Sequence, residues 1–343
     1  DAHGTPRRKR QSTHMSAYGP LAMVADVLSG IYAWVTSLCC AVTCSTQSMQ
    51  VNERNLRVVK LLAEGGFSFV YLVEDDEKKK YALKKVLAQL PEASELARWE
   101  VQVHQSFKHA NLMPLIDHAV VSTASGAEEF RLLMPLYPDG TLLDLAVRLM
   151  EGGKRLEEGR ALHLFAQVCE GVLALHSHSP PWAHRDIKPA NILLSEGDVP
   201  VLMDFGSVAS ARRHISNRTE ALLLQEDAAQ NCSMPYRAPE LFDTPSQGDI
   251  DERTDVFSLG ATLYAMAFYY SPFECTFQDN VQRVVECSHL RVIAPAQFPS
   301  SHPYSAPFVG LIEEMLTVDA SKRPFVPEVL RRVRSMQQAV IDF

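Results

Sequence analysis

The feature that most constrains the fold of this chain is the segment HRDIKPANILLSEGDVPVLMDFG at residues 184–206. Two short apolar runs, ILL and VPVLM, lie on either side of a polar SEGD turn. This pattern predicts two antiparallel strands joined as a hairpin. Pairing the runs places Asn191 beside Asp204 at the open end of the hairpin, and Asp186 lies five residues before Asn191 on the preceding loop.

The predicted hairpin therefore gathers two carboxylates and one amide oxygen at a single point. Oxygen ligands of this kind suit Mg²⁺, which needs only one or two carboxylates when substrate phosphates supply further ligands. A carboxylate at the position of Asp186 can also orient a hydroxyl group and receive its proton. The charges lie at the rim because the apolar strands are buried and hold them in place.

The overall composition is that of a globular protein, with 343 residues of which 46% are hydrophobic and 22% charged. The net charge is −8, and residues 1–50 carry +2, so the remainder carries −10. An acidic body of this kind excludes nucleic acid as a partner and suits basic protein substrates. The seven cysteines show neither metal-ligand spacing nor a disulfide pattern, which indicates a reducing compartment.

Apolar periodicity predicts a strand-rich part followed by a larger helical part. Residues 56–86 alternate apolar and polar positions as three antiparallel strands would, and residues 130–137 have the pattern of a further strand. Residues 91–107 have the pattern of a helix. Further helical patterns lie at 142–151, 160–178, 254–270, 307–316 and 326–340.

The first fifty residues differ from the rest of the chain. Residues 1–16 are polar and basic without periodicity, which is typical of disorder. Residues 27–46 contain no charge and include Cys39, Cys40 and Cys44. Four interpretations remain open for this stretch: a membrane-spanning helix, a signal peptide, a peripheral anchor with acylated cysteines, and an extension without a membrane role. We favour the acylated anchor.

Four motifs in order resemble the signature set of the eukaryotic protein kinases. The motifs are His184-Arg185-Asp186, Asn191, Asp204-Phe205-Gly206 and Ala238-Pro239-Glu240. The resemblance implies an α+β, two-lobed kinase fold, with a strand-rich lobe at 53–137, a mainly helical lobe at 138–340 and an N-terminal extension at 1–50. It also implies ATP and Mg²⁺ as cofactors and proteins with Ser or Thr as substrates.

The resemblance assigns roles to individual residues. Lys84 is implied to grip the α- and β-phosphates, with a helix glutamate as its partner. Glu100 is the candidate, because Leu96, Glu100, Val103 and Phe107 would share one buried helical face; Glu92 and Glu95 are the alternatives. Asp186 is implied to be the catalytic base, and Lys188 to steady the transferred phosphoryl group.

The remaining implied site residues form three groups. Asn191 and Asp204 would bind Mg²⁺. Arg185, Ser233, Glu240, Asp255 and Arg323 would hold the catalytic loop and the activation segment, with Glu240 and Arg323 as a buried ion pair. The ATP-binding residues would be Leu62, Gly65, Gly66, Val70, Ala82, Lys84, Met134, Leu136 and Tyr137.

Longer segments resemble the Numb-associated kinase family over residues 53–335. The segments are EGGFSFVYLVE, AAQNCSMPYRAPELF, DERTDVFSLGATLYAM and MLTVDASKRP. That family carries an extra helix in the activation segment, which residues 219–232 would supply; the alternative is a mobile loop. Such a helix would hold the segment active without phosphorylation. Its myristoylated and palmitoylated branch implies a cytoplasmic protein bound peripherally to the Golgi or another endomembrane, through the three cysteines, and a role in trafficking or secretory-pathway signalling.

The chain departs from the family pattern in two places. The three glycine positions of the phosphate loop are Ala63, Gly65 and Ser68, and we expect Ala63 to weaken ATP binding by about 1 kcal/mol at most. The N-terminal residues show no Met-Gly myristoylation signal.

Two rival functions are a pseudokinase scaffold and a small-molecule kinase. The presence of Lys84 and Asp186 counts against the first, and the Ala-Pro-Glu motif against the second.

Overall fold

The computed structural model describes residues 48–65, 68–124 and 126–341. The predictions for the N-terminal extension up to residue 47, including the three cysteines, and the prediction for Gly66 lie outside the described residues. The fold class is α+β, as predicted. No helix in the described ranges combines the length and the apolar character that a membrane crossing requires.

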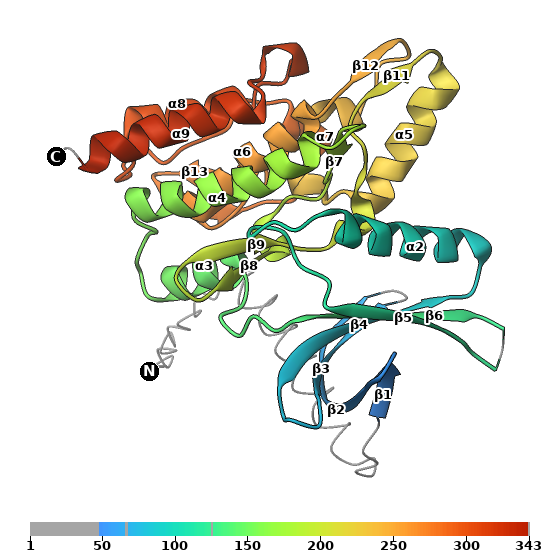
Figure 1. Cartoon of the computed structure of the whole chain (residues 1–343). Helices are drawn as coiled ribbons and strands as arrows, with labels where there is room; N and C mark the ends of the chain where they lie inside the picture. The colour runs from blue at the N-terminus through green and yellow to red at the C-terminus, as the bar shows by residue number, and fades with distance from the viewer. Residues whose placement is uncertain (1–47, 66–67, 125, 342–343) are drawn as a thin grey trace, which may run out of the picture. The chain divides into compact units, whose positions relative to one another are not determined.

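A six-stranded antiparallel sheet forms the first part of the structure, in the order β1-β2-β3-β4-β6-β5 (Figure 1). The three strands predicted within 56–86 are confirmed as β2, β3 and β4, and the strand predicted at 130–137 is confirmed as β6. The sheet begins at Ser48 rather than at residue 53, because β1 is a short edge strand whose full length pairs with β2. The strands are β1 Ser48–Val51, β2 Arg54–Gly65, β3 Ser68–Glu74, β4 Lys80–Ala88, β5 Asp117–Ser122 and β6 Glu128–Pro135.

Helix α2 (Pro91–Ser106) packs against one face of this sheet (Figure 1). Ala97 and Val101 are buried against Phe130 of β6, and proline at the first helical position favours the start of the helix. The predicted buried face is wrong at Leu96, whose side chain is 62% exposed. The buried residues of α2 are Ala97, Glu100, Val101, Val103 and His104, so Ala97 rather than Leu96 faces the sheet.

The second part of the structure is mainly helical. All five helical patterns after residue 140 are confirmed within two residues at each end. Helix α6 is buried around its whole circumference, and Gly260 permits its close approach to α8, since a Cβ atom there would lie 2.8 Å from Cβ of Met315. The five helices are α3 Leu142–Glu151, α4 Glu158–His176, α6 Arg253–Phe268, α8 Ala306–Met315 and α9 Val326–Ile341, and the short α7 His289–Val292 was not predicted.

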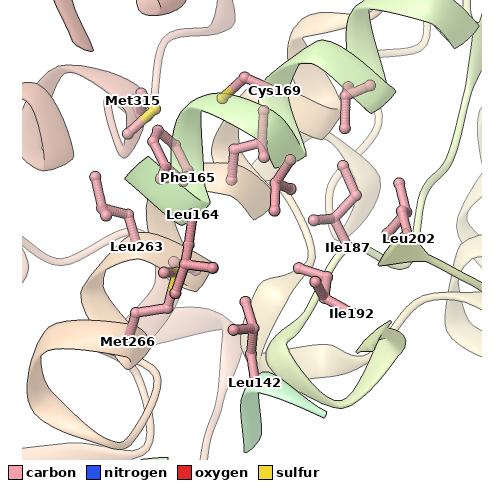
Figure 2. Packing of buried hydrophobic residues seen from close by; sticks show 14 of the residues in the cluster. Leu142, Leu164, Phe165, Cys169, Ile187, Ile192, Leu202, Leu263, Met266 and Met315 are labelled. Atoms are coloured by element: carbon pink, nitrogen blue, oxygen red, sulfur yellow. The ribbon is translucent and has the colours of Figure 1, made fainter. Parts of the chain in front are cut away.

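The largest hydrophobic core lies around α4 and α6. Figure 2 shows Leu164, Phe165 and Cys169 of α4 in one core with Leu263 of α6 and with Ile192, the first residue of the hairpin. These side chains are fully buried. The same core therefore supports the hairpin that carries the candidate site.

The predicted hairpin is confirmed as β8 (Ile192–Ser195) and β9 (Val199–Leu202), with Ile192 opposite Leu202.

The segment that follows forms short strand pairs and the helix α5 (Arg218–Asn231), which confirms a helix at the place predicted for residues 219–232. Asn217 caps α5 by accepting a hydrogen bond from the N–H of Glu220. The other short strands are β7 Trp182–Ala183, β10 Ala209–Ser210, β11 Arg213–Ile215, β12 Gly248–Ile250, β13 Cys275–Gln278 and β14 Val281–Val284.

Candidate active site

The site centres on Asp186, whose two carboxylate oxygens are both held in place. Oδ1 accepts a hydrogen bond from the backbone N–H of Ser233 at 2.9 Å. Oδ2 accepts from Nζ of Lys188 and from Nδ2 of Asn191, each at 2.8 Å. Lys188 also donates to Oγ of Ser233 at 2.6 Å. The four residues, which are 47 positions apart in sequence at most, therefore form one connected group with the carboxylate at its centre.

The loop that carries Asp186 is held in place by Asp255 of α6. This fully buried carboxylate accepts hydrogen bonds from the backbone N–H groups of His184 and Arg185 at 2.7 and 2.8 Å. It also contacts Nε2 of His176 at 2.9 Å. Burial acts to raise the pKa of Asp255, but these hydrogen bonds outweigh burial and the pKa is lowered. The charged carboxylate thus orients the loop backbone.

Lys84 of β4 connects the sheet to both α2 and the hairpin. Its Nζ lies 2.6 Å from Oε1 of Glu100 and 3.1 Å from Oδ1 of Asp204. The partner on α2 is therefore Glu100 rather than Glu92 or Glu95. Burial alone would lower the pKa of Lys84, but the two carboxylates raise it, and Lys84 in turn lowers the pKa of Asp204. Lys84 and Asp204 are therefore charged at neutral pH.

Four of the predicted ATP-binding residues share one face of the sheet. The register pairs Val70 with Lys84 and Ala82 with Met134, and side chains two residues apart on a strand point to the same side. Leu83, between Ala82 and Lys84, is buried on the opposite face. The face that carries Lys84 is the one against which α2 packs.

The other predicted ATP-binding residues flank this face. Leu62 lies near the end of β2, and Gly65 is its last residue, opposite Ser68. Leu136 and Tyr137 follow the end of β6 and are half-buried; burial raises the pKa of Tyr137. Ala63 lies in extended strand opposite Val70, so the φ restriction that a methyl group would impose in the left-handed region does not arise.

Asn191 and Asp204 offer oxygen atoms that fit a magnesium ion. Nδ2 of Asn191 donates both to the backbone oxygen and to Oδ2 of Asp186, which turns its Oδ1 atom the other way. The Asp204 side chain is 49% exposed, and its Oδ1 atom contacts Lys84. An amide oxygen and a charged, accessible carboxylate are ligands that Mg²⁺ prefers.

Two contacts anchor the segment that follows the hairpin. Arg323, whose side chain is fully buried, donates to both carboxylate oxygens of Glu240 at 2.7 and 2.6 Å, so the expected ion pair is present. Arg185 donates from Nη1 to Oδ2 of Asp227 on α5 at 2.6 Å. Sequence reasoning missed Asp227, because α5 carries other acidic residues and nothing local distinguishes this one.

Comparison with known proteins identifies the family to which the chain belongs. Residues 56–333 match the family model described as protein kinase domain. The chain belongs to the protein kinase family. The match includes every residue assigned to the site, from Leu62 to Arg323.

Curated relatives narrow the description of this kinase. It is 38% identical to serine/threonine-protein kinase 16 of Homo sapiens, over 86% of this chain and 94% of the relative. A probable serine/threonine-protein kinase of Dictyostelium discoideum is 37% identical over 86% of this chain and 97% of its own length. Serine/threonine-protein kinase ppk13 of Schizosaccharomyces pombe is 32% identical over 82% and 91%. The kinase is a serine/threonine protein kinase, and the resemblance to the human protein's branch is confirmed.

Proposed function

We propose that this kinase transfers the γ-phosphoryl group of ATP to Ser and Thr hydroxyls of proteins with Asp186 as the catalytic base. The observation that carries the proposal is the arrangement of Asp186, whose two oxygens are fixed by Ser233, Lys188 and Asn191. A carboxylate held in this way can align the attacking hydroxyl group and receive its proton. Lys188 lies close enough to place a positive charge beside the transferred group.

The six-stranded sheet with α2 would form the smaller lobe, at 53–137 together with β1, and residues 138–340 the larger one. ATP would lie against the sheet face that carries Lys84, with Met134 beside the adenine and Leu136 and Tyr137 offering backbone groups to it. Leu62, Gly65, Gly66, Val70 and Ala82 would cover the nucleotide. Lys84, oriented by Glu100, would hold the α- and β-phosphates.

Protein kinases use ATP with Mg²⁺, and the residues fit this ion. Asn191 and Asp204 would hold it through the amide oxygen and the carboxylate. When bound, the ion neutralises charge on the phosphates. Lys84 keeps Asp204 ionised, as the lowered pKa of that carboxyl indicates, so a negative ligand is present at neutral pH.

The supporting residues would act through the backbone. Asp255 would keep the loop of Asp186 in place, and Glu240 with Arg323 would anchor the end of the activation segment. Arg185 would join that segment to the loop through Asp227. Each of these assignments rests on the hydrogen bonds described above.

The catalytic proposal is tested by phosphoryl transfer from labelled ATP to a basic protein. Asp186→Asn and Asp204→Asn are each expected to lower kcat by about 10²-fold or more, because each removes a group that acts on the reacting atoms. The control is Asp76→Asn, which removes an exposed carboxylate in the turn between β3 and β4. ATP binding without transfer by the wild-type protein would favour the scaffold, and transfer only to a small molecule would favour the small-molecule kinase.

We also propose that the kinase is a peripheral membrane protein that acts in trafficking or secretory-pathway signalling. Cys39, Cys40 and Cys44 would be acylated, and a single acyl chain binds membranes only marginally, so at least two are needed. The basic cluster at residues 7–10 would add contact with anionic lipid. The support is the sequence pattern and the resemblance to the acylated branch.

Changing the three cysteines to serine tests the anchor. The triple variant is expected to move from the endomembrane fraction to the supernatant while its activity on a dissolved protein substrate stays unchanged. The matched control is Cys287→Ser, which alters a half-buried thiol elsewhere in the chain. Unchanged fractionation of the triple variant would reject this anchor.

A further inference from the structure

Trp99 lies on α2 directly before Glu100 and ties that helix to the segment after Asp204. The indole Nε1–H donates a hydrogen bond to the backbone oxygen of Val208 at 2.7 Å. Val208 is buried, and its own N–H donates to the oxygen of Phe205 at 3.1 Å, which closes the turn that follows Asp204. One hydrogen bond therefore joins the helix that carries Glu100 to the turn that carries Asp204.

The Trp99 ring also belongs to an aromatic cluster, defined here as Trp99, Phe107, His178 and Trp182. Trp182 is at its centre: its ring centroid lies 5.0 Å from that of Trp99, 5.6 Å from that of Phe107 and 3.9 Å from that of His178. The Trp99 and Trp182 rings meet edge to face at 66°, a favourable arrangement. Trp182 is 5% exposed and pairs across the strands with Ser210, two residues after Val208.

In the first half of α2, Ala97 is buried against Phe130 and Arg98 pairs with Glu128. The start of the helix has no side-chain cap, and Leu90 and Leu96 are 65% and 62% exposed. The second half is anchored by His104, whose Nδ1 atom lies 3.1 Å from the oxygen of Met113. Trp99 and Glu100 lie between these halves. Trp99 is thus the neighbour of Glu100 that joins α2 to the segment after Asp204.

We propose that Trp99 is a positioning residue that holds α2 where Glu100 reaches Lys84. It does so through the hydrogen bond to Val208 and the packing against Trp182. The inference rests on the role proposed above for Glu100 and Lys84. Val208 follows the turn after Asp204. The Trp99 indole therefore helps to position both Glu100 and Asp204, the two carboxylates that contact Lys84.

Trp99→Phe is the direct test, since it removes the N–H group and keeps an aromatic ring. Steady-state kinetics with a peptide acceptor are expected to show kcat/KM for ATP about five-fold lower, equivalent to about 1 kcal/mol for one hydrogen bond. Replacing Trp99 by 3-benzothienylalanine, which keeps the bicyclic shape and lacks the N–H, should give the same loss even if phenylalanine packs poorly. Leu96→Ala on the exposed side of α2 is the control and should leave kcat/KM unchanged.

A double-mutant cycle with Glu100→Gln distinguishes positioning from general stabilisation. If Trp99 acts through Glu100, Trp99→Phe should cause no further loss of kcat/KM in the Glu100→Gln background. An equal loss in both backgrounds, or full activity in both Trp99 variants, would overturn the inference while leaving the proposed function intact. Full activity of Glu100→Gln alone would overturn the proposed role of the Lys84–Glu100 pair and the inference together.

Discussion

Arg185 donates a hydrogen bond to Asp227 across 2.6 Å, and this contact joins the loop that carries Asp186 to helix α5. Arg185 is only 8% exposed, and a buried cation needs a negative partner. Asp227 is itself oriented by Nδ2 of Asn231 at 2.7 Å. In many kinases the activation segment is phosphorylated, and the added phosphate group pairs with an arginine. In this kinase a carboxylate of the chain makes the contact.

We therefore expect activity without phosphorylation of the activation segment. Phosphatase treatment should leave kcat intact, whereas Asp227→Ala should lower it several-fold and increase hydrogen exchange in residues 218–231. The size of the effect is limited because the Asp227 side chain is 39% exposed. Glu226→Ala makes the same change of charge at a neighbouring exposed position and should be neutral. A large loss of activity on phosphatase treatment would contradict the expectation.

The Glu240–Arg323 pair should contribute strongly to stability. Glu240→Gln leaves the fully buried Arg323 side chain without its carboxylate, and breaking a buried pair in this way costs about 3 kcal/mol or more. Denaturant unfolding should show this loss in the free energy of unfolding. Glu328→Gln breaks the exposed pair with Arg331, where the loss in the free energy of unfolding should be much smaller. Equal losses in the two variants would refute the argument.

His104 should make the stability of the kinase sensitive to mild acid. Burial lowers its pKa from the ordinary value of 6.5. Because the folded-state pKa is lower, the unfolded chain binds the proton first, so stability is lost as the pH falls below 6.5 towards the folded-state value. Melting temperatures measured from pH 7.5 to 5.5 should therefore fall more steeply for the wild type than for His104→Gln. Parallel curves would show that His104 does not contribute.

Ala63 should affect nucleotide binding only slightly. It lies in extended strand, so Ala63→Gly relieves no backbone strain and removes one methyl group above the nucleotide. The KM for ATP should fall by at most about five-fold, equivalent to about 1 kcal/mol, and an unchanged KM would show that the departure is neutral. A rise in KM would contradict the idea that the methyl group crowds ATP.

Local patterns in the sequence were sufficient to predict the hairpin, the central strands and the long helices. Alternation of apolar residues depends on one face being buried, so β2, β3 and β4 were recognisable. The edge strand β1 was not, because four residues carry too little pattern to separate a strand from a loop. Leu96 was misplaced because periodicity gives the spacing of a buried face, and both Leu96 and the neighbouring Ala97 fit that spacing.

The ion pair of Lys84 with Glu100 could be anticipated from the resemblance together with the helical spacing. Asp227 and Trp99 could not, since their contacts join positions 42 and 109 residues apart and exist only once the chain has folded. Both residues act on parts of the site that sequence patterns had already identified. These two supporting contacts could not be predicted, because they depend on tertiary packing rather than on a motif.

Strand β1 decides how a pull on the N-terminus is transmitted. Residues 48–51 directly follow the N-terminal extension, and they pair with β2 through their full length. A pulling force on the extension would act on the hydrogen bonds between β1 and β2, in the same sheet that carries Lys84. If the extension anchors the kinase to a membrane, a pulling force on the extension would act first on the pairing of β1 with β2. Separation of β1 would then release the force before it could distort the strands around Lys84.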